Sequence, residues 1–271
     1  MRNLLLATAV LFGAALPARA NAAAGDGHTH LTWYGHATFS ITTPKGLVLV
    51  VDPWFSNPKA VDKEALTKLG KADYVLVSHG HFDHTADAIT LGQGGAKLIS
   101  SFELGSALVA AGYPKDQAGM DTLANAGGTL SLGDEVTVSL VPAVHSSGYS
   151  PPNSTGPAEY GGSPVGFVIQ IKGGPTIYHT GDTDVFYDMK DRIGDRFKVD
   201  VMLACIGGHF TMDPEGAALA ATYVKPKQIV PMHFGTFPVL TGTPDELAKA
   251  LKAHHSKSKM LEMKVGEALT L

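Results

Sequence analysis

Short apolar runs alternate with segments of helical periodicity along most of the chain. In the first half, apolar runs bounded by polar or turn-forming residues predict strands, and amphipathic segments between them predict helices. The run 47–51 is apolar throughout, which is typical of a strand covered on both faces. The predicted strands span residues 30–33, 37–43, 47–51, 74–77 and 97–100, and the predicted helices span 63–69, 86–91 and 103–111.

The second half continues this alternation after a segment with three glycines, 125–134, which predicts a turn-rich connection. Thr243-Pro244-Asp245-Glu246 is typical of a helix start, because a capping residue precedes proline and acidic residues. Together the elements indicate an α/β (α+β) protein. The predicted strands are 136–141, a hairpin of 165–171 and 176–178, 199–206, 228–230 and a closing pair 260–265 and 268–271; the predicted helices are 214–223 and 243–253.

Residues 146–164 show no periodicity and are rich in glycine, proline and serine, with Tyr149 and Tyr160 among them. Long irregular segments in compact domains are usually functional or disordered. We interpret this one as a lid or a substrate-binding loop, with a passive insertion as the alternative.

The N-terminal segment 1–24 has the pattern of a secretory signal peptide. Arg2 precedes an apolar run that is followed by Ala18-Arg19-Ala20, which predicts cleavage near Ala20 or Ala22. The apolar run is shorter than the roughly 20 residues that cross a bilayer, so we expect no stable membrane anchor. We therefore predict an exported, periplasmic protein with one domain over residues 25–271.

Charge and cysteine content restrict the possible partners. Removing the signal peptide leaves 19 basic and 25 acidic residues, a net charge of −6, which disfavours a nucleic-acid partner. The only cysteine, Cys205, lies in an apolar strand-like run, so we expect a buried thiol and no intrachain disulfide.

Potential metal ligands crowd the end of one predicted strand. The run Val75–Val77 is followed within seven residues by His79, His81, Asp83 and His84. Imidazole and carboxylate groups suit zinc, with manganese or iron as alternatives, and His79 and His81 in a non-helical turn can converge on one ion. A solvated polar loop is the alternative, but three of the twelve histidines fall within six positions.

The pattern His-x-His-x-Asp-His resembles the metallo-β-lactamase superfamily of dinuclear metal hydrolases. His145, Asp182 and His233 follow in the order that this superfamily uses, each after an apolar run. The resemblance implies a four-layered αβ/βα sandwich with the site along one edge.

The resemblance also implies how the ligands are shared, whereas spacing alone gives candidates without pairings. It assigns His79, His81 and His145 to a first metal, Asp83, His84 and His233 to a second, and Asp182 to a bridge between them. Two divalent ions, preferably Zn²⁺, would activate a hydroxide that cleaves an ester, lactone or phosphodiester bond of a small substrate. The β-lactam-cleaving members lack a bridging aspartate, so a β-lactamase is disfavoured.

Longer matches narrow the resemblance to a group of uncharacterised metal-dependent hydrolases, more distantly related to ascorbate-6-phosphate lactonase and N-acylphosphatidylethanolamine phospholipase D. The signal peptide and the segment 146–164 depart from the usual cytoplasmic members. The matching segments are 31–39, 52–54, the histidine-rich turn (residues 79–84), 178–183, 207–213 and 231–238.

Further polar residues are candidates for supporting roles. Asp52, at the end of the run 47–51, is interpreted as a carboxylate that orients a metal-bound histidine or as a turn residue before proline. Asp83, His36 and His209 are the catalytic candidates. The two histidines would line the cleft or stabilise an oxyanion, and structural histidines are the alternative. His179 is expected to point away from the metals or to support a ligand.

Two other functions are alternatives to the hydrolysis of a small substrate. A catalytically idle metal-binding or sensor protein would be favoured by replacement of a ligand, and none is replaced. A phospholipase-D-like lipid hydrolase would need an apolar rim, but the segment 146–164 has only two aromatic residues. A small soluble substrate is therefore preferred, and His254 and His255 are interpreted as surface residues.

Overall fold

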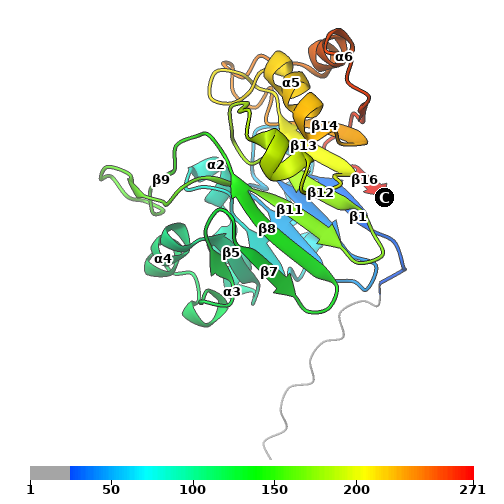
Figure 1. Ribbon diagram of the computed structural model, residues 1–271. Coiled ribbons are helices and arrows are strands. Elements are labelled where there is room, and N and C mark those ends of the chain that lie inside the picture. The colour runs from blue at the N-terminus through cyan, green and yellow to red at the C-terminus, as the bar shows by residue number, and fades with distance from the viewer. Residues whose placement is uncertain (1–24) are drawn as a thin grey trace, which may run out of the picture.

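The computed structural model describes residues 25–271, so the predicted signal peptide lies outside the described residues. Two seven-stranded sheets form the centre of the molecule (Figure 1). The first sheet has the order β16-β1-β2-β3-β4-β5-β6. Its strands are β1 (His30–Trp33), β2 (Phe39–Thr42), β3 (Val48–Val51), β4 (Tyr74–Leu76), β5 (Lys97–Ser101), β6 (Leu123–Ala124) and β16 (Ala268–Thr270).

The second sheet has the order β15-β14-β13-β12-β11-β8-β7. A separate two-stranded ribbon pairs β9 (Gly148–Tyr149) with β10 (Glu159–Tyr160). The strands of the second sheet are β7 (Thr129–Leu132), β8 (Val136–Pro142), β11 (Val165–Ile171), β12 (Thr176–His179), β13 (Val201–Cys205), β14 (Gln228–Met232) and β15 (Lys259–Met260).

Helices cover the outer faces of the sandwich. Figure 1 shows α3 and α4 beside the first sheet, and α5 and α6 at the opposite side of the molecule. The α-helices are α1 (Ala65–Leu69), α2 (Phe82–Thr85), α3 (Ala88–Gln93), α4 (Phe102–Ala110), α5 (Pro214–Val224) and α6 (Pro244–Ala253); a 3₁₀ turn spans Lys115–Gln117 and a π-helical turn spans Lys190–Gly194.

The central strands β3 and β4 of the first sheet are buried on both faces. In β3, Leu49 and Val51 pack into the core between the sheets, whereas Val50 packs with the helices outside. Strand β4 divides its side chains in the same way, with Leu76 inside and Val75 outside. This alternation explains why the run 47–51 is apolar at every position. The predicted mixed α/β sandwich is confirmed.

Helix α6 begins as its sequence predicted. The Thr243 side chain accepts a hydrogen bond from the Glu246 amide, and the Glu246 carboxylate accepts one from the Thr243 amide, with Pro244 in the first turn. These reciprocal bonds satisfy amides that the helix itself leaves unpaired.

None of the helices within residues 25–271 has both the length and the apolar character of a membrane span.

Three local predictions were wrong. The connection 125–134 contains β7, whose alternating side chains pair with β8. The closing pair does not exist, because β15 extends the second sheet beside β14 and β16 extends the first beside β1. Short strands of this kind depend on the neighbour available in the fold rather than on local preference. The segment 146–164, expected to be irregular, contains the ribbon β9–β10.

Candidate metal centre

Every predicted ligand lies just beyond the end of a strand. Strands β3, β4 and β5 run parallel in the first sheet, and β12, β13 and β14 run parallel in the second. Parallel strands end at the same edge of their sheet, so the residues that follow them gather there. The histidine-rich turn follows β4, Asp182 follows β12, and His233 follows β14. The two sheets therefore present their polar strand ends to one another at one edge of the sandwich.

Three histidines form a first group with converging ring nitrogens. Nε2 of His79 lies 2.9 Å from Nδ1 of His81, and Nε2 of His145 lies 3.3 Å from the same nitrogen. All three atoms lie within 4.8 Å of one another. This group matches the set that the resemblance assigned to the first metal.

A second group combines Asp83, His84 and His233 with His36. Asp83 Oδ2 lies 2.9 Å from Nε2 of His36 and 3.8 Å from Nε2 of His233. His36, for which a cleft-lining group and a structural histidine were both open, is fully buried and hydrogen-bonded to Asp83. The other three residues are those that the resemblance assigned to the second metal.

Asp182 lies between the two groups. Its Oδ2 atom is 3.0 Å from Nε2 of His233 and 3.4 Å from Nε2 of His84 in the second group. The same oxygen is 3.7 Å from Nε2 of His145 and 3.9 Å from Nε2 of His79 in the first. One carboxylate thus faces histidines of both groups.

The donor atoms fit divalent cations. Within residues 25–271, Asp182 Oδ1 and His84 Nε2 are buried without a hydrogen-bond partner. Buried polar atoms are nearly always paired, and an unmet one is unfavourable. The five imidazoles and two carboxylates of the predicted ligand set all belong to these groups, and they offer the nitrogen and oxygen ligands that zinc prefers. A cation bound here would satisfy both orphaned atoms.

Burial and neighbouring charges shift the pKa values of the centre in different directions. Burial alone would raise the pKa of Asp182, but the charges of His233 and His84 hold it well below the ordinary value. Burial lowers the pKa of His79 well below the ordinary value, which leaves a neutral imidazole able to ligate. Burial also opposes charge on His84, but Asp182, Asp52 and Asp83 outweigh it and raise the pKa of His84 well above its usual value.

Asp52 supports the second group from behind. Its Oδ2 accepts a hydrogen bond from Nδ1 of His84 at 2.8 Å, and its Oδ1 accepts one from the amide of Ser78 at 2.8 Å. The Ser78 hydroxyl donates to Oδ2 at 2.7 Å. Asp52 is thus the carboxylate that the sequence placed behind a ligand histidine, and it fixes the proton of His84 on Nδ1.

His36 and His209 occupy very different environments. Burial, with the charge of His233, lowers the pKa of His36 to about 4, and its ring lies between Thr236 Oγ1 at 2.6 Å and Asp83. His209 is exposed and belongs to neither ligand group in the described residues. The structure therefore does not bring His209 to the cluster, and its catalytic role stays a prediction.

His179 points away from the ligand groups, as expected. Its Nε2 donates to the carbonyl of Ala37 at 2.9 Å, and its Nδ1 accepts from the amide of Gly181 at 3.1 Å. The ring thereby joins the first sheet to the turn that carries Asp182. His179 acts as a structural connection between the two sheets.

The ribbon segment 146–164 is fixed at its base and exposed at its tip. The amide of Gly80 donates to Ser147 Oγ at 3.1 Å, and Tyr149 is buried with the helices of the first sheet. Ser146 Oγ lies 3.4 Å from Nε2 of His81. The segment therefore borders the first histidine group, while residues 152–160 extend into solvent.

Sequence reasoning missed two residues that shape the centre. Thr236 contacts His36 across 200 positions of the chain, and no local pattern indicates such a contact. Gly207 passes so close to His233 that an added Cβ would lie 2.3 Å from the His233 carbonyl oxygen. The pair Gly207-Gly208 before His209 was the available signal for this close approach.

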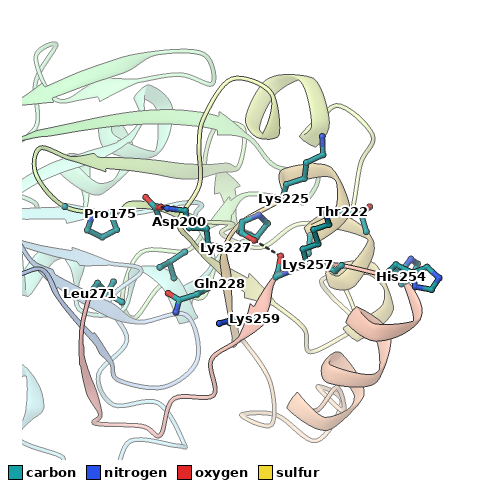
Figure 2. Close-up of a pocket in the computed structure, with 17 residues that line it drawn as sticks. Pro175, Asp200, Thr222, Lys225, Lys227, Gln228, His254, Lys257, Lys259 and Leu271 are labelled. Atoms are coloured by element: carbon teal, nitrogen blue, oxygen red, sulfur yellow. Dashed lines mark hydrogen bonds and ion pairs between the residues drawn. The ribbon is translucent and has the colours of Figure 1, made fainter.

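A groove of about 1130 Å³ lies at the opposite end of the second sheet, where β13 and β14 begin. Figure 2 shows its lysines, and Lys227 pairs with Asp200 at 2.7 Å. His254, which lies 3.0 Å from Glu215, and His255 line this groove. Both are thus far along the strands from the ligand groups, as expected of surface residues.

Comparison with known proteins identifies the family. The model of the beta-lactamase superfamily domain matches residues 30–233. A UPF0173 metal-dependent hydrolase of Anaeromyxobacter dehalogenans is 63% identical over 231 residues, covering 84% of this chain and 83% of that protein. Another, from Thermodesulfovibrio yellowstonii, is 48% identical over 252 residues, covering 92% and 94%.

Among solved structures, Igni18, a metallo hydrolase from the archaeon Ignicoccus hospitalis, is 35% identical with a TM-score of 0.76. The match covers 90% of this chain and 98% of that one. The histidines at the strand ends, the sandwich architecture and these relatives all indicate the same family. The chain belongs to the metal-dependent hydrolases of the metallo-β-lactamase superfamily.

Proposed function

We propose that the protein binds two divalent metal ions and hydrolyses an ester, lactone or phosphodiester bond of a small substrate. The observation that carries the proposal is the position of Asp182, whose Oδ2 faces both histidine groups within 3.9 Å. A single carboxylate in this position can neutralise two cations that would otherwise repel one another.

Zn²⁺ is the metal that we propose, with Mn²⁺ or Fe²⁺ as alternatives. His79, His81 and His145 would hold one ion, Asp83, His84 and His233 would hold the other, and Asp182 would contact both. When bound, such ions polarise the scissile carbonyl or phosphoryl oxygen and bring the pKa of water towards neutrality.

The protonation and burial of the candidate ligands determine from which side a substrate can reach them. Burial opposes ionisation of Asp83, but His84 and the hydrogen bond from His36 lower its pKa well below the ordinary value, so Asp83 stays a carboxylate. His79 and His84 are fully buried, whereas His81 and His145 are partly exposed. The substrate would therefore approach from the side of His81 and His145.

Metal analysis and turnover assays of the purified protein test this proposal. We expect the wild type to hold two ions and to hydrolyse at least one of bis(p-nitrophenyl) phosphate and a lactone, but not nitrocefin. Asp182→Ala and His81→Ala should lose hydrolysis and bind less metal. The exposed His255 provides the control, since His255→Ala should change neither quantity. Full activity in Asp182→Ala would refute the assigned centre.

We also propose that the protein is exported to the periplasm, on the basis of the sequence of residues 1–24. Fractionation of a Gram-negative host that expresses the full chain tests this directly. The periplasmic protein should begin near Asn21 or Ala23, as determined by mass spectrometry. Recovery of the uncleaved chain in the cytoplasm alone would contradict export.

A further inference from the structure

We propose that three aromatic rings beside the metal centre, Trp54, Phe82 and Phe237, bind a planar apolar group of the substrate. We call these residues the aromatic wall. The proposal rests on the proposed function and adds the class of substrate: an ester, lactone or phosphodiester that carries an aryl or similar flat apolar group next to the bond that is cleaved.

Phe82 is exposed where a polar residue would be expected. It lies between the ligand candidates His81 and Asp83, and 59% of it is accessible to solvent. A ring in this position contributes little to the core. Exposed apolar side chains that gather beside a polar centre mark binding surfaces more often than they mark structural features.

The three rings form a corner. Trp54 and Phe237 lie nearly parallel, with ring centroids 5.8 Å apart and 19° between their planes. Phe82 stands at 75° to Trp54 and at 69° to Phe237, with centroids 5.5 and 6.3 Å away. Trp54 is almost buried and supports the other two, which are more exposed. Such a corner offers ring faces and edges to one further flat group.

The aromatic wall is continuous with the second ligand group. The His36 ring lies 5.2 Å from Trp54 and 5.9 Å from Phe237, and it is hydrogen-bonded to Asp83. The same ring lies 3.9 Å from that of His233. The ring of His36 therefore contacts both the aromatic wall and the candidate ligands Asp83 and His233.

The chemistry of the wall selects among substrate groups. The side chains of Phe82 and Phe237 carry no charge and no hydrogen-bonding group, so they would not bind a phosphate or a sugar favourably. Three rings also form a smaller surface than a long acyl chain requires. The three rings come from three separate turns, so the segment 146–164, from which we inferred a small soluble substrate, does not reveal them.

A matched pair of anions tests the wall without relying on turnover. Phenylphosphonate and methylphosphonate present the same head group to the metal ions and differ in the ring alone. Calorimetric titration of the zinc-loaded protein should give a dissociation constant about tenfold lower for phenylphosphonate, a ratio that corresponds to about 1.4 kcal/mol. Phe82→Ala and Phe237→Ala should reduce this ratio to nearly one, and Phe82→Tyr should keep it.

Met120 provides a control, because it is 83% exposed and belongs to no ligand group in the described residues. Met120→Ala should leave the ratio unchanged, and each variant should retain its zinc. Equal affinities in the wild type, or no binding of phenylphosphonate, would overturn the inference. The inference would also be overturned if Phe82→Ala converted a dimer into monomers while the affinity ratio persisted, because Phe82 would then belong to a subunit interface. If the ratio behaves as expected but no diester, ester or lactone is cleaved, the proposed function fails and the wall remains.

Discussion

Asp52 and His84 are joined by a fully buried hydrogen bond of 2.8 Å between the end of β3 and the turn after β4. The bond fixes the protonated nitrogen of His84 as Nδ1 and directs Nε2 towards Asp182. The backbone of Asp52 adopts a positive φ of 46°, which is uncommon for residues other than glycine. The surrounding contacts thus hold a strained residue where it orients a ligand.

Asp52→Asn should weaken metal binding at the second group. The amide cannot accept from His84 and from both Ser78 donors as a carboxylate does, so His84 loses its fixed orientation. Replacement of such a supporting group typically lowers metal affinity by about 10- to 100-fold. Competition with a chromophoric zinc chelator measures the change. Asp134→Asn, which removes an exposed carboxylate paired with Lys45, is the control, and an equal effect of both variants would contradict the role of Asp52.

Binding of the second ion should release a proton. Three carboxylates raise the pKa of His84 above its ordinary value, which favours a protonated His84 in the metal-free protein. A ligand nitrogen must be deprotonated. Zinc titration of the metal-free protein in buffers of different ionisation enthalpy should reveal about one proton released from this residue. Proton uptake, or none exchanged in any buffer, would argue against His84 as a ligand.

Metal removal should also lower stability, because a ligand that binds only the folded state stabilises it. At a free ion concentration 1,000 times the dissociation constant the gain is about 4 kcal/mol. Chelation followed by thermal unfolding should give a lower Tm, and zinc should restore it. Magnesium, which prefers oxygen ligands, should restore it poorly. An unchanged Tm after verified metal loss would contradict a cation between the sheets.

Gly207→Ala should disturb the His233 side of the centre. The new Cβ would lie 2.3 Å from the His233 carbonyl oxygen, so the backbone that carries the ligand must shift. Overpacking of this kind costs about 1–3 kcal/mol, and we expect loss of bound metal as well. Urea unfolding and metal analysis check both. Gly156→Ala, which meets only the Ser154 hydroxyl at 3.7 Å, should be neutral in both measurements.

Thr243→Ala should destabilise the fold without affecting the metal centre. The substitution removes the side-chain half of the capping box at the start of α6, for which about 1 kcal/mol is typical. Equilibrium unfolding in urea should show the loss, with metal content unchanged. Restoration by Thr243→Ser would support the cap, whereas equal loss in the serine variant would indicate another cause.

Cys205 should make stability decline in alkaline solution. Burial raises the pKa of its thiol to about 11, from an ordinary value of 9.0. Above pH 9 the unfolded chain loses this proton first, so stability falls as the pH rises from about 9 to 11, by up to about 3 kcal/mol. Comparison of wild type with Cys205→Ala over this range isolates the contribution of the thiol. Parallel pH profiles would disprove it.

The sequence indicates the candidate metal ligands because each of them follows an apolar strand. His79, Asp182 and His233 are recognisable in this way, and the order of elements then requires that parallel strands end together. The partition of the ligands between two metals is implied by the resemblance to a family and stays a prediction, although the donor atoms within each predicted set lie close together.

Long-range contacts explain what the sequence could not predict. The bond between His36 and Thr236 joins two turns of opposite sheets, and neither turn carries a pattern that names its partner. His209 follows two glycines as a cleft residue would, yet it is exposed. The strands β15 and β16 are too short for their alternation to reveal a sheet, so they were paired with each other by proximity in sequence.

The pairing of β1 with β16 joins the first sheet to residues near the far end of the chain. During synthesis, β1 leaves the ribosome early and keeps one hydrogen-bonding edge open until residues 268–270 emerge. Closing so large a loop costs chain entropy, so we expect this pairing to form late in folding. A fusion that delays or blocks this closure should therefore promote aggregation through β1, whereas the same fusion placed in the exposed ribbon tip should be tolerated.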